Sequence, residues 1–210
     1  MQNYQVLPLK YRPQSLDEIW IQEHIKTTLK RAIETNRVAH AYLFAGPRGV
    51  GKTTTARILA KSLNCVKGPT IHPCQKCSVC NEITNSASLD VLEIDGASNR
   101  GIDQVRELRE NVKFLPTSCP YKIYIIDEVH MLTPEAFNAL LKTLEEPPAH
   151  VKFIFATTAP QKVPATIISR CQRFDFRKAT VEEIVQRLSW IAKNEGIEIS
   201  EEALFAIGKR

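Results

Sequence analysis

Short apolar runs alternate along the chain with stretches in which apolar residues recur every three or four positions. The runs have strand length and occupy residues 42–45, 90–95, 122–127 and 151–157, with a weaker one at 172–176. The periodic stretches at 102–112 and 135–145 have the spacing of one helix face. Thr133 and Pro134 supply an N-cap and a first-turn proline to the second of them. Alternating strands and helices predict an α/β fold with a parallel sheet covered on both faces.

The N-terminal part has weaker signals. Leu9–Pro13 is expected to be extended, because Pro13 disfavours the helical conformation at Arg12. Ser15–Glu18 has the spacing of a capping box. Helical periodicity follows it at Ile25, Leu29, Ala32 and Ile33.

In the C-terminal part, two successive helical patterns replace the alternation of strands and helices. Thr180–Glu183 is another capping-box pattern, which predicts a helix that Gly196 ends, and Ser200 begins a second helix. Two helices this short do not form a stable bundle alone. We therefore expect an α/β domain over 1–179 and the start of a helical domain, incomplete in this sequence, over 180–210.

Composition and charge set broad limits. The 210 residues are 43% hydrophobic and 24% charged, which is ordinary for a soluble globular protein. The 28 basic and 23 acidic side chains give a net charge of +5, which fits a nucleic-acid partner and fits a solvated surface equally well. No apolar run approaches the roughly 18 residues of a membrane span, and the N-terminus lacks a signal-peptide pattern. We expect a cytoplasmic protein that does not contact membranes.

A phosphate-binding loop lies between the first strand and the next helix. Residues 46–53 read GPRGVGKT and fit the P-loop pattern G-x-x-x-x-G-K-[ST]. The glycines let backbone N–H groups surround phosphate oxygens, Lys52 would reach the β- and γ-phosphates, and the Thr53 hydroxyl would bind Mg²⁺. A glycine turn that binds nothing is the alternative, and the flanking strand and helix argue against it. The predicted nucleotide-binding residues are Gly46, Pro47, Arg48, Gly49, Val50, Gly51, Lys52, Thr53 and Thr54.

Two acids follow the apolar run 123–126, in a Walker B pattern. Asp127 would stand at the carboxyl end of a strand beside the P-loop and hold Mg²⁺ through water. Glu128 would orient and polarise the attacking water. Two acids at a strand end can also form a simple turn, but the accompanying P-loop favours hydrolysis of a nucleoside triphosphate.

Two further motifs have weak signals by themselves. The strand over 151–157 should end beside the acids, so a threonine hydroxyl at Thr157 or Thr158 could sense the γ-phosphate, although threonines at strand ends are usually only strand formers. Arg170 lies in the sequence Ser-Arg-Cys, and a lone arginine on a loop is most often a surface residue.

Four cysteines follow the P-loop helix in the pattern C-x8-C-x2-C-x2-C. In a reducing compartment a disulfide framework is disfavoured, whereas C-x2-C steps suit a tetrahedral, structural Zn²⁺ site. An iron–sulfur cluster and unliganded buried thiols are the alternatives, and His72 could replace one thiolate or merely flank the site. Cys119 and Cys171 are expected to be ordinary thiols. The predicted zinc ligands are Cys65, Cys74, Cys77 and Cys80.

Six of these features occur together and in order. They are Tyr11–Pro13, the P-loop, the four cysteines, Asp127–Leu132, Leu141–Pro148 and Ser169–Cys171. In this combination the chain resembles the gamma/tau family of bacterial DNA polymerase III clamp-loader subunits, which are AAA+ ATPases. The resemblance covers essentially all 210 residues.

The resemblance implies a five-stranded AAA+ core with sheet order 5-1-4-3-2, a zinc module at about 64–82 and a helical lid. It implies that Arg170 is an arginine finger that reaches the γ-phosphate of a neighbouring subunit, and that Thr158, rather than Thr157, is sensor 1. Arg12 and Pro13 would lie near the adenine.

The resemblance also implies partners. Arg100 would contact DNA phosphate and the helix around Phe137 would contact the sliding clamp. The partners would be other clamp-loader subunits in a ring-like hetero-oligomer, the sliding clamp and primer–template DNA, within a DNA polymerase holoenzyme.

The implied function is an ATP-driven motor subunit that opens the clamp, places it on primer–template DNA and hydrolyses ATP to release it. A nucleotide-gated scaffold that organises polymerase subunits without hydrolysis is the alternative, and a ring that remodels DNA junctions is a third. Many relatives have glycine where Ile21 precedes Gln22, which leaves base contacts there open. Sensor 2, a lid arginine, would lie beyond Arg210, so we expect weak or absent nucleotide binding and hydrolysis from this chain alone.

Overall fold

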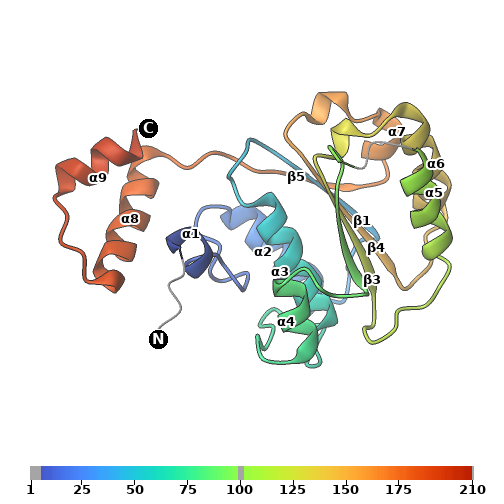
Figure 1. Cartoon of the computed structure of the whole chain (residues 1–210), viewed down its shortest axis with the longest axis horizontal. Coiled ribbons are helices and arrows are strands. Elements are labelled where there is room, and N and C mark those ends of the chain that lie inside the picture. The colour runs from blue at the N-terminus through green and yellow to red at the C-terminus, as the bar shows by residue number, and fades with distance from the viewer. Residues whose placement is uncertain (1–5, 99–101, 210) are drawn as a thin grey trace.

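A five-stranded parallel sheet forms the centre of the computed structural model, which describes residues 6–98 and 102–209 (Figure 1). Its order is β2-β3-β4-β1-β5, and every adjacent pair is parallel. This confirms the predicted α/β class and the order 5-1-4-3-2. The strands are β1 (Ala41–Ala45), β2 (Val91–Asp95), β3 (Lys122–Asp127), β4 (Val151–Thr157) and β5 (Gln172–Asp175).

Helices cover both faces of the sheet. One face carries α2 (Glu23–Glu34), α3 (Lys52–Asn64) and α4 (Ser78–Thr84). The other carries α5 (Ile102–Asn111), α6 (Pro134–Glu145) and the short α7 (Ala165–Ile168). The remaining elements are α1 (Leu7–Lys10), the 3₁₀ turns η1 (Val129–Met131) and η2 (Pro160–Lys162), α8 (Val181–Glu195) and α9 (Glu201–Gly208).

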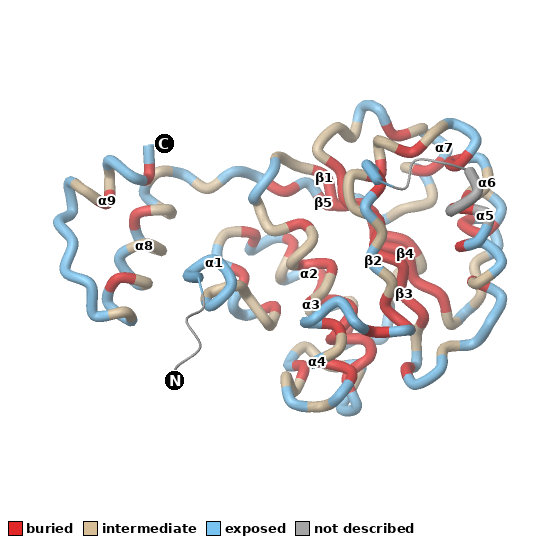
Figure 2. Tube along the Cα trace, viewed as in Figure 1, coloured by how far each residue is buried: buried red, intermediate tan, exposed pale blue. Residues whose placement is uncertain are grey.

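The core consists of two apolar layers separated by the sheet. Tyr42 and Phe44 of β1 pack against α2 and α3, whereas Leu43 between them packs on the other side, because successive side chains of a strand point to opposite faces. All seven residues of β4 are buried, and buried residues concentrate in the strands and in the helix faces that touch them (Figure 2). The apolar runs at 42–45, 122–127 and 151–157 are therefore central strands, whereas β2 and β5 form the two edges of the sheet.

Helix α8 and helix α9 lie apart from the sheet, beyond α1 (Figure 1). The Thr180 capping box forms as predicted: the Glu183 N–H donates to the Thr180 hydroxyl at 3.2 Å, and the Thr180 N–H donates to the Glu183 carboxylate at 2.9 Å. Gly196 ends α8 with a φ of 67°, and Ser200 caps α9. In the part of the chain that is described, no helix is long and apolar enough to cross a membrane.

Two predictions for the N-terminal part are wrong. Leu9 and Lys10 are helical, because the restriction imposed by Pro13 falls on Arg12 alone and α1 ends before it. The Ser15–Glu18 pattern opens no helix: the Glu18 carboxylate accepts hydrogen bonds from the Gln14 N–H and the Ser15 hydroxyl within a single turn. A single turn gains too few hydrogen bonds to extend by itself, and α2 begins later, without a side-chain cap.

Asp90 fastens the loop before β3 to the start of β2. Its carboxylate is 1% exposed and accepts hydrogen bonds from the N–H groups of Thr117, Ser118 and Cys119 at 2.7, 2.7 and 3.0 Å. Burial raises the pKa of this carboxyl, but these hydrogen bonds lower it more, so its pKa lies below the ordinary 3.8.

We predict that Asp90→Ala lowers the free energy of unfolding by about 2–4 kcal/mol, because the buried carboxylate is lost and the N–H groups of Thr117, Ser118 and the buried Cys119 lose their acceptor. Urea unfolding measures it, with the exposed Glu34→Ala as control. Since the folded pKa is depressed, the contribution of Asp90 is present above the ordinary pKa and is lost as the pH falls through the folded value. A loss below about 1 kcal/mol, or one that does not shrink on acidification, would contradict this role.

Candidate nucleotide site and cysteine cluster

The loop between β1 and α3 has the backbone geometry that its glycines predict. Gly51, the N-cap of α3, has a φ of 94°, in the left-handed region that favours glycine. At Gly46 a side chain would collide with the chain after β5, since an added Cβ would lie 2.5 Å from the carbonyl oxygen of Phe176. The loop therefore wraps closely around the N-terminus of α3, where N–H groups and the helix dipole favour an anion.

Lys52 is buried inside this loop. Its side chain is at the start of α3, the residue is 6% exposed, and Nζ donates to the carbonyl oxygens of Gly46 at 2.8 Å and Pro47 at 2.6 Å. Burial lowers the pKa of Lys52, while the nearby Glu128 and Asp127 carboxylates raise it. The ammonium group is thus held inside the loop by two backbone carbonyl oxygens. These hydrogen-bond partners, found among the described residues, are neutral, and a phosphate could replace them.

Thr53 and Asp127 meet across the gap between α3 and β3. The Thr53 hydroxyl donates to Oδ2 of Asp127 at 2.6 Å, and Oδ1 of Asp127 accepts from the Glu128 N–H at 2.8 Å. A hydroxyl and a carboxylate at this separation are both oxygen ligands of the kind that Mg²⁺ binds at about 2.1 Å. The residues present therefore fit a magnesium ion bound together with phosphate.

Glu128 stands at the mouth of the site in an uncommon conformation. Its backbone is left-handed, with φ 46° and ψ 45°, which costs about 1–3 kcal/mol for a residue with a side chain. Oε2 accepts hydrogen bonds from the Thr158 N–H at 3.1 Å and hydroxyl at 2.8 Å, and lies 3.3 Å from Nδ1 of His130. Nε of Arg48, on the P-loop, is 3.8 Å from Oε1. These contacts fix the carboxylate close to the P-loop.

The two candidate threonines have different surroundings. Thr157 is fully buried, and its hydroxyl lies 3.0 Å from Nδ1 of His130 and accepts from the Ala159 N–H at 3.0 Å. Thr158 instead bonds Glu128 directly. The structure therefore brings Thr158, and not Thr157, to the carboxylate. His130 was missed by the sequence analysis, because its contacts to Thr157 and Glu128 depend on the distant strand β4.

Two neighbouring cavities surround the P-loop. The phosphate-side cavity, of about 370 Å³, contains the acids and the lysine, and is lined by Arg12, Arg48, Gly49, Gly51, Lys52, Thr53, Thr54, Asp127 and Glu128. The second, of about 430 Å³, shares Arg12, Gly49, Gly51 and Thr54 with it. We call the second one the base-side cavity, because Tyr11, Pro13, Ile19 and Trp20 line it with aromatic and apolar surface of the kind that a purine ring contacts.

Arg12 and Pro13, the predicted adenine contacts, both line the base-side cavity. Trp20, Ile21 and Gln22 also line the base-side cavity. The sequence alone did not decide whether this segment contacts the base.

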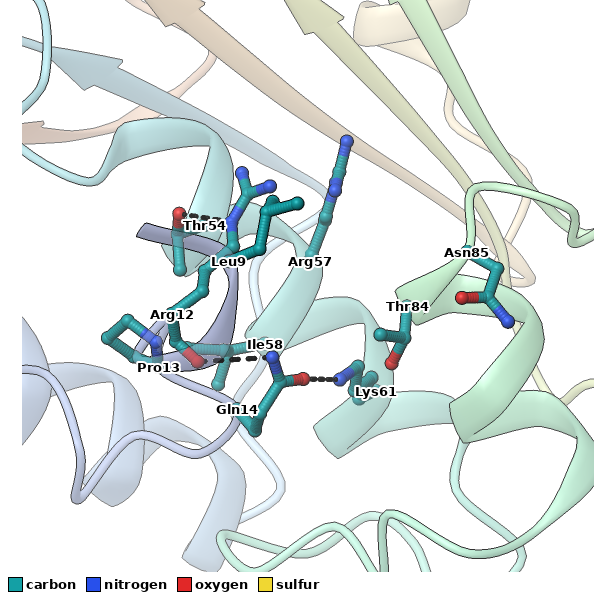
Figure 3. A pocket seen from close by; sticks show the side chains of 10 residues that line it. All are labelled: Leu9, Arg12, Pro13, Gln14, Thr54, Arg57, Ile58, Lys61, Thr84 and Asn85. Atoms are coloured by element: carbon teal, nitrogen blue, oxygen red, sulfur yellow. Dashed lines mark hydrogen bonds between the residues drawn. The ribbon is translucent and has the colours of Figure 1, made fainter. Parts of the chain in front are cut away.

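Hydrogen bonds fix the segment that carries Arg12 to α3 (Figure 3). Nε of Arg12 donates to the Thr54 hydroxyl at 3.1 Å, and the Gln14 side chain donates to the Arg12 carbonyl oxygen at 3.1 Å. Nζ of Lys61 then donates to the Gln14 amide oxygen at 2.6 Å. These residues line a further cavity of about 230 Å³ on the side of α3 that faces α4. The wall of the base-side cavity is thus attached to the helix that follows the P-loop.

Arg170 lies away from the site of its own chain. Its Nη2 donates to the Glu145 carboxylate of α6 at 2.6 Å and its Nη1 to the Thr166 carbonyl oxygen at 2.6 Å. It lines neither of the two cavities around the P-loop. Arg100, the predicted DNA contact, lies outside the described residues. Phe137 is 4% exposed and packs in the core, and the contact of the helix around it with the sliding clamp stays a prediction.

The four predicted cysteine ligands come together between α3 and α4. All four Sγ atoms lie within 4.8 Å of one another. Four thiolates bound at about 2.3 Å to one zinc ion stand about 3.8 Å apart, so the cluster fits a tetrahedral ion. The predicted ligands that form this cluster are Cys65, Cys74, Cys77 and Cys80.

Backbone amides donate hydrogen bonds to the sulfur atoms of the cluster. The N–H groups of Cys74, Cys77 and Cys80 donate to the sulfurs of the preceding cysteines at 3.3–3.4 Å. The N–H groups of Lys76 and Cys77 lower the pKa of Cys74 to about 6, whereas burial raises that of Cys80 to about 12.

The other candidates lie apart from the cluster. Nδ1 of His72 is 3.2 Å from the Asp17 carboxylate, and this histidine is not part of the sulfur cluster. Burial raises the pKa of Cys119 to about 11 and that of Cys171 to about 12, as expected of unreactive thiols.

Comparisons with known proteins agree with this geometry. The DNA polymerase III subunit tau of Bacillus subtilis is 53% identical over 202 residues, which are 96% of this chain and 36% of that protein. The Escherichia coli subunit tau is 50% identical over 195 residues, 93% of this chain and 30% of that protein. The chain therefore spans about a third of the length of these curated relatives.

A solved structure confirms the fold. The RuvB Holliday junction branch migration motor of Thermotoga maritima has a TM-score of 0.68 at 23% identity and covers 95% of this chain and 60% of that chain. At this identity the likeness concerns the fold alone, and it agrees with the predicted P-loop AAA+ fold. The family model described as DNA polymerase III, delta subunit matches residues 21–180. The chain therefore belongs to this family of DNA polymerase III clamp-loader subunits, as a relative of its gamma/tau members.

Proposed function

We propose that this chain is the ATP-hydrolysing part of a clamp-loader subunit. ATP binding arranges the assembly so that it opens the sliding clamp and places it on primer–template DNA, and hydrolysis releases the clamp. The observation that carries the proposal is the convergence of Lys52, Thr53, Asp127, Glu128 and Thr158 at one sheet edge. A protein that binds nucleotide without hydrolysing it does not need Glu128 and Thr158 in this arrangement.

In this proposal the phosphate-side cavity holds Mg·ATP. Lys52 exchanges its two carbonyl partners for β- and γ-phosphate oxygens, and its positive charge offsets theirs. Thr53 and Asp127 would hold Mg²⁺. The ion would neutralise charge that develops on the phosphates. The base would occupy the base-side cavity, beside Arg12 and Pro13.

Glu128 is the proposed general base. It is now held by Thr158 and His130, so it must exchange these hydrogen bonds for one from the attacking water before it can accept a proton. Thr158, as sensor 1, is the group that keeps the carboxylate in place until then. Hydrolysis therefore requires a rearrangement of Glu128, in addition to nucleotide binding.

Arg170 is the proposed arginine finger of a neighbouring site. Its position outside the cavities of its own chain supports action between subunits. The Glu145 partner would be exchanged for the γ-phosphate, and such a finger contributes about 10³–10⁵ in rate. Helices α8 and α9 are proposed as the start of the lid, with residues 1–179 as the ATPase domain and about 64–82 as the zinc module. The DNA contact of Arg100 stays a prediction.

A surface contact for the sliding clamp is available after α5. Phe114 is 64% exposed and Leu115 is 75% exposed, side by side in the loop before β3. Adjacent apolar side chains this exposed indicate a protein partner. We propose this loop as a clamp contact, and the contact of the helix around Phe137 stays a prediction. A scaffold without hydrolysis is the alternative function, and the preserved Glu128 and Arg170 disfavour it.

The first prediction of the proposed function concerns hydrolysis. In the intact assembly with clamp and primer–template DNA, Glu128→Gln should keep ATP binding and lower the hydrolysis rate about 10²–10⁴-fold, because the amide cannot accept the proton of water. Phosphate release measures the rate. Glu146→Gln, an exposed acid of α6's C-terminus, is the matched control. Turnover at the wild-type rate in Glu128→Gln would leave only the scaffold function.

The second prediction concerns the clamp. Phe114→Ser with Leu115→Ser should weaken clamp binding by the ATP-loaded assembly at least about tenfold, since two buried apolar side chains would contribute about 3–6 kcal/mol to the contact. Surface plasmon resonance on immobilised clamp measures it. Val66→Ser, another 70% exposed apolar residue, is the control and should change nothing. An unchanged affinity in the double variant would place the clamp elsewhere.

The third prediction concerns the metal. Elemental analysis of the purified chain should find about one zinc per chain, and Cys77→Ser should remove most of it, because three thiolates bind zinc far more weakly than four. Cys171→Ser should keep the zinc. Iron in place of zinc would indicate an iron–sulfur cluster, and a chain free of metal would indicate that the thiols are unliganded.

A further inference from the structure

Both tryptophans of the chain contact the same guanidinium group. Arg187 is on α8, and the carbon at the centre of its guanidinium is 4.5 Å from the ring centre of Trp190 and 5.3 Å from that of Trp20. Trp190 is one turn further along the same helix, whereas Trp20 belongs to the loop before α2. A cation attracts the face of each ring. Arg187 therefore joins α8 to a loop that is more than 160 residues away in sequence.

The same helix also holds the N-terminal segment. Nη2 of Arg187 donates to the Tyr11 carbonyl oxygen at 3.3 Å. The Tyr11 ring meets the Trp190 ring edge-on, with centres 5.5 Å apart. At the end of α8, Glu195 accepts a hydrogen bond from the Tyr11 hydroxyl and pairs with Lys10 at 2.6 Å. We call Tyr11, Trp20, Arg187, Trp190 and Glu195 the clasp.

Two members of the clasp form part of the base-side cavity. Tyr11 and Trp20 line that cavity, and no member of the clasp lines the phosphate-side cavity. The other side of the segment is fixed to α3 through Arg12 and Gln14. The position of Tyr11 and Trp20, and thus the width of the base-side cavity, therefore depends on α8 through Arg187.

We propose that Arg187 is a positioning residue for the nucleotide base. It holds the aromatic wall against which the base packs and contributes nothing to the phosphates. The inference rests on the proposed nucleotide site and goes beyond it, because it assigns base recognition to a cation–π contact between the helical part and the loop before α2. The two cavities are separate, and this gives the test. A substitution of Arg187 should weaken the binding of a ligand that has a base and leave the binding of a ligand without a base nearly unchanged.

The experiment compares Mg·ATP with Mg·tripolyphosphate, which has the phosphates and no base. Isothermal titration of the intact subunit measures both dissociation constants. Arg187→Ala should weaken ATP binding about tenfold, the order expected for a partly buried cation–π contact, and change tripolyphosphate binding less than about twofold. Arg187→Lys should be intermediate, since it keeps the charge and loses the planar group.

The controls separate this role from a merely structural one. Lys193→Ala, an exposed cation on α8, should bind both ligands as the wild type does. If Arg187→Ala does not fold, as judged by thermal unfolding, Arg187→Lys alone decides. Equal weakening of both ligands, or no weakening of ATP, would overturn the proposal. A wild-type subunit that binds tripolyphosphate as tightly as ATP would overturn it too. A wild-type subunit that binds neither ligand would instead overturn the proposed nucleotide site.

Discussion

The parallel register of β1, β3 and β4 decides where the chemistry of this protein lies. Ala45 is level with Thr157, and Ile126 is level with Phe155, so Asp127 and Thr158 leave the sheet at the edge where the P-loop begins. Tyr124 and Phe153 face each other across β3 and β4 with ring centres 5.5 Å apart, and Phe153 stacks on Phe155. A slip of one residue would turn these rings to the opposite face. Aromatic packing in the core therefore fixes the alignment of the site.

The polar groups at this edge are already paired with one another. Lys52 bonds backbone carbonyls, Thr53 bonds Asp127, and Glu128 bonds Thr158. A buried polar group without a partner costs about 1–3 kcal/mol, more if charged, so this pairing stabilises the site when no nucleotide is bound. In the proposed function, nucleotide binding would exchange these partners for phosphate, magnesium and water. The left-handed backbone of Glu128 shows that the strand end is held in place by its surroundings.

Local spacing predicted the conformation of the P-loop, the grouping of the four cysteines and the Thr180 capping box. The resemblance to a known family predicted the sheet order. Side-chain contacts between distant elements were not predicted. His130 contacts Thr157 and Arg187 contacts Trp20 only because the sheet and α8 bring them together. The Ser15–Glu18 pattern had the right spacing for a helix, but its bonds were satisfied within one turn.

The cysteine cluster and the base-side cavity share one support. Gln75, between two of the cysteines, has a left-handed backbone with φ 56°, and its side chain donates to the Gln14 carbonyl oxygen at 2.6 Å. Its amide oxygen accepts from Lys61 at 3.0 Å, and Lys61 is 2% exposed. Burial lowers the pKa of Lys61, and the hydrogen bonds described for Nζ reach only the amide oxygens of Gln14 and Gln75.

A buried ammonium group that donates to two neutral acceptors is destabilised by the loss of either acceptor. The cysteine loop must therefore hold Gln75 in place for Lys61 to hold Gln14. Gln14 in turn follows Arg12 and Pro13, which line the base-side cavity. A metal ion that fixes the cysteine loop would thus act on the nucleotide site through Gln75 and Lys61, without any contact to the nucleotide.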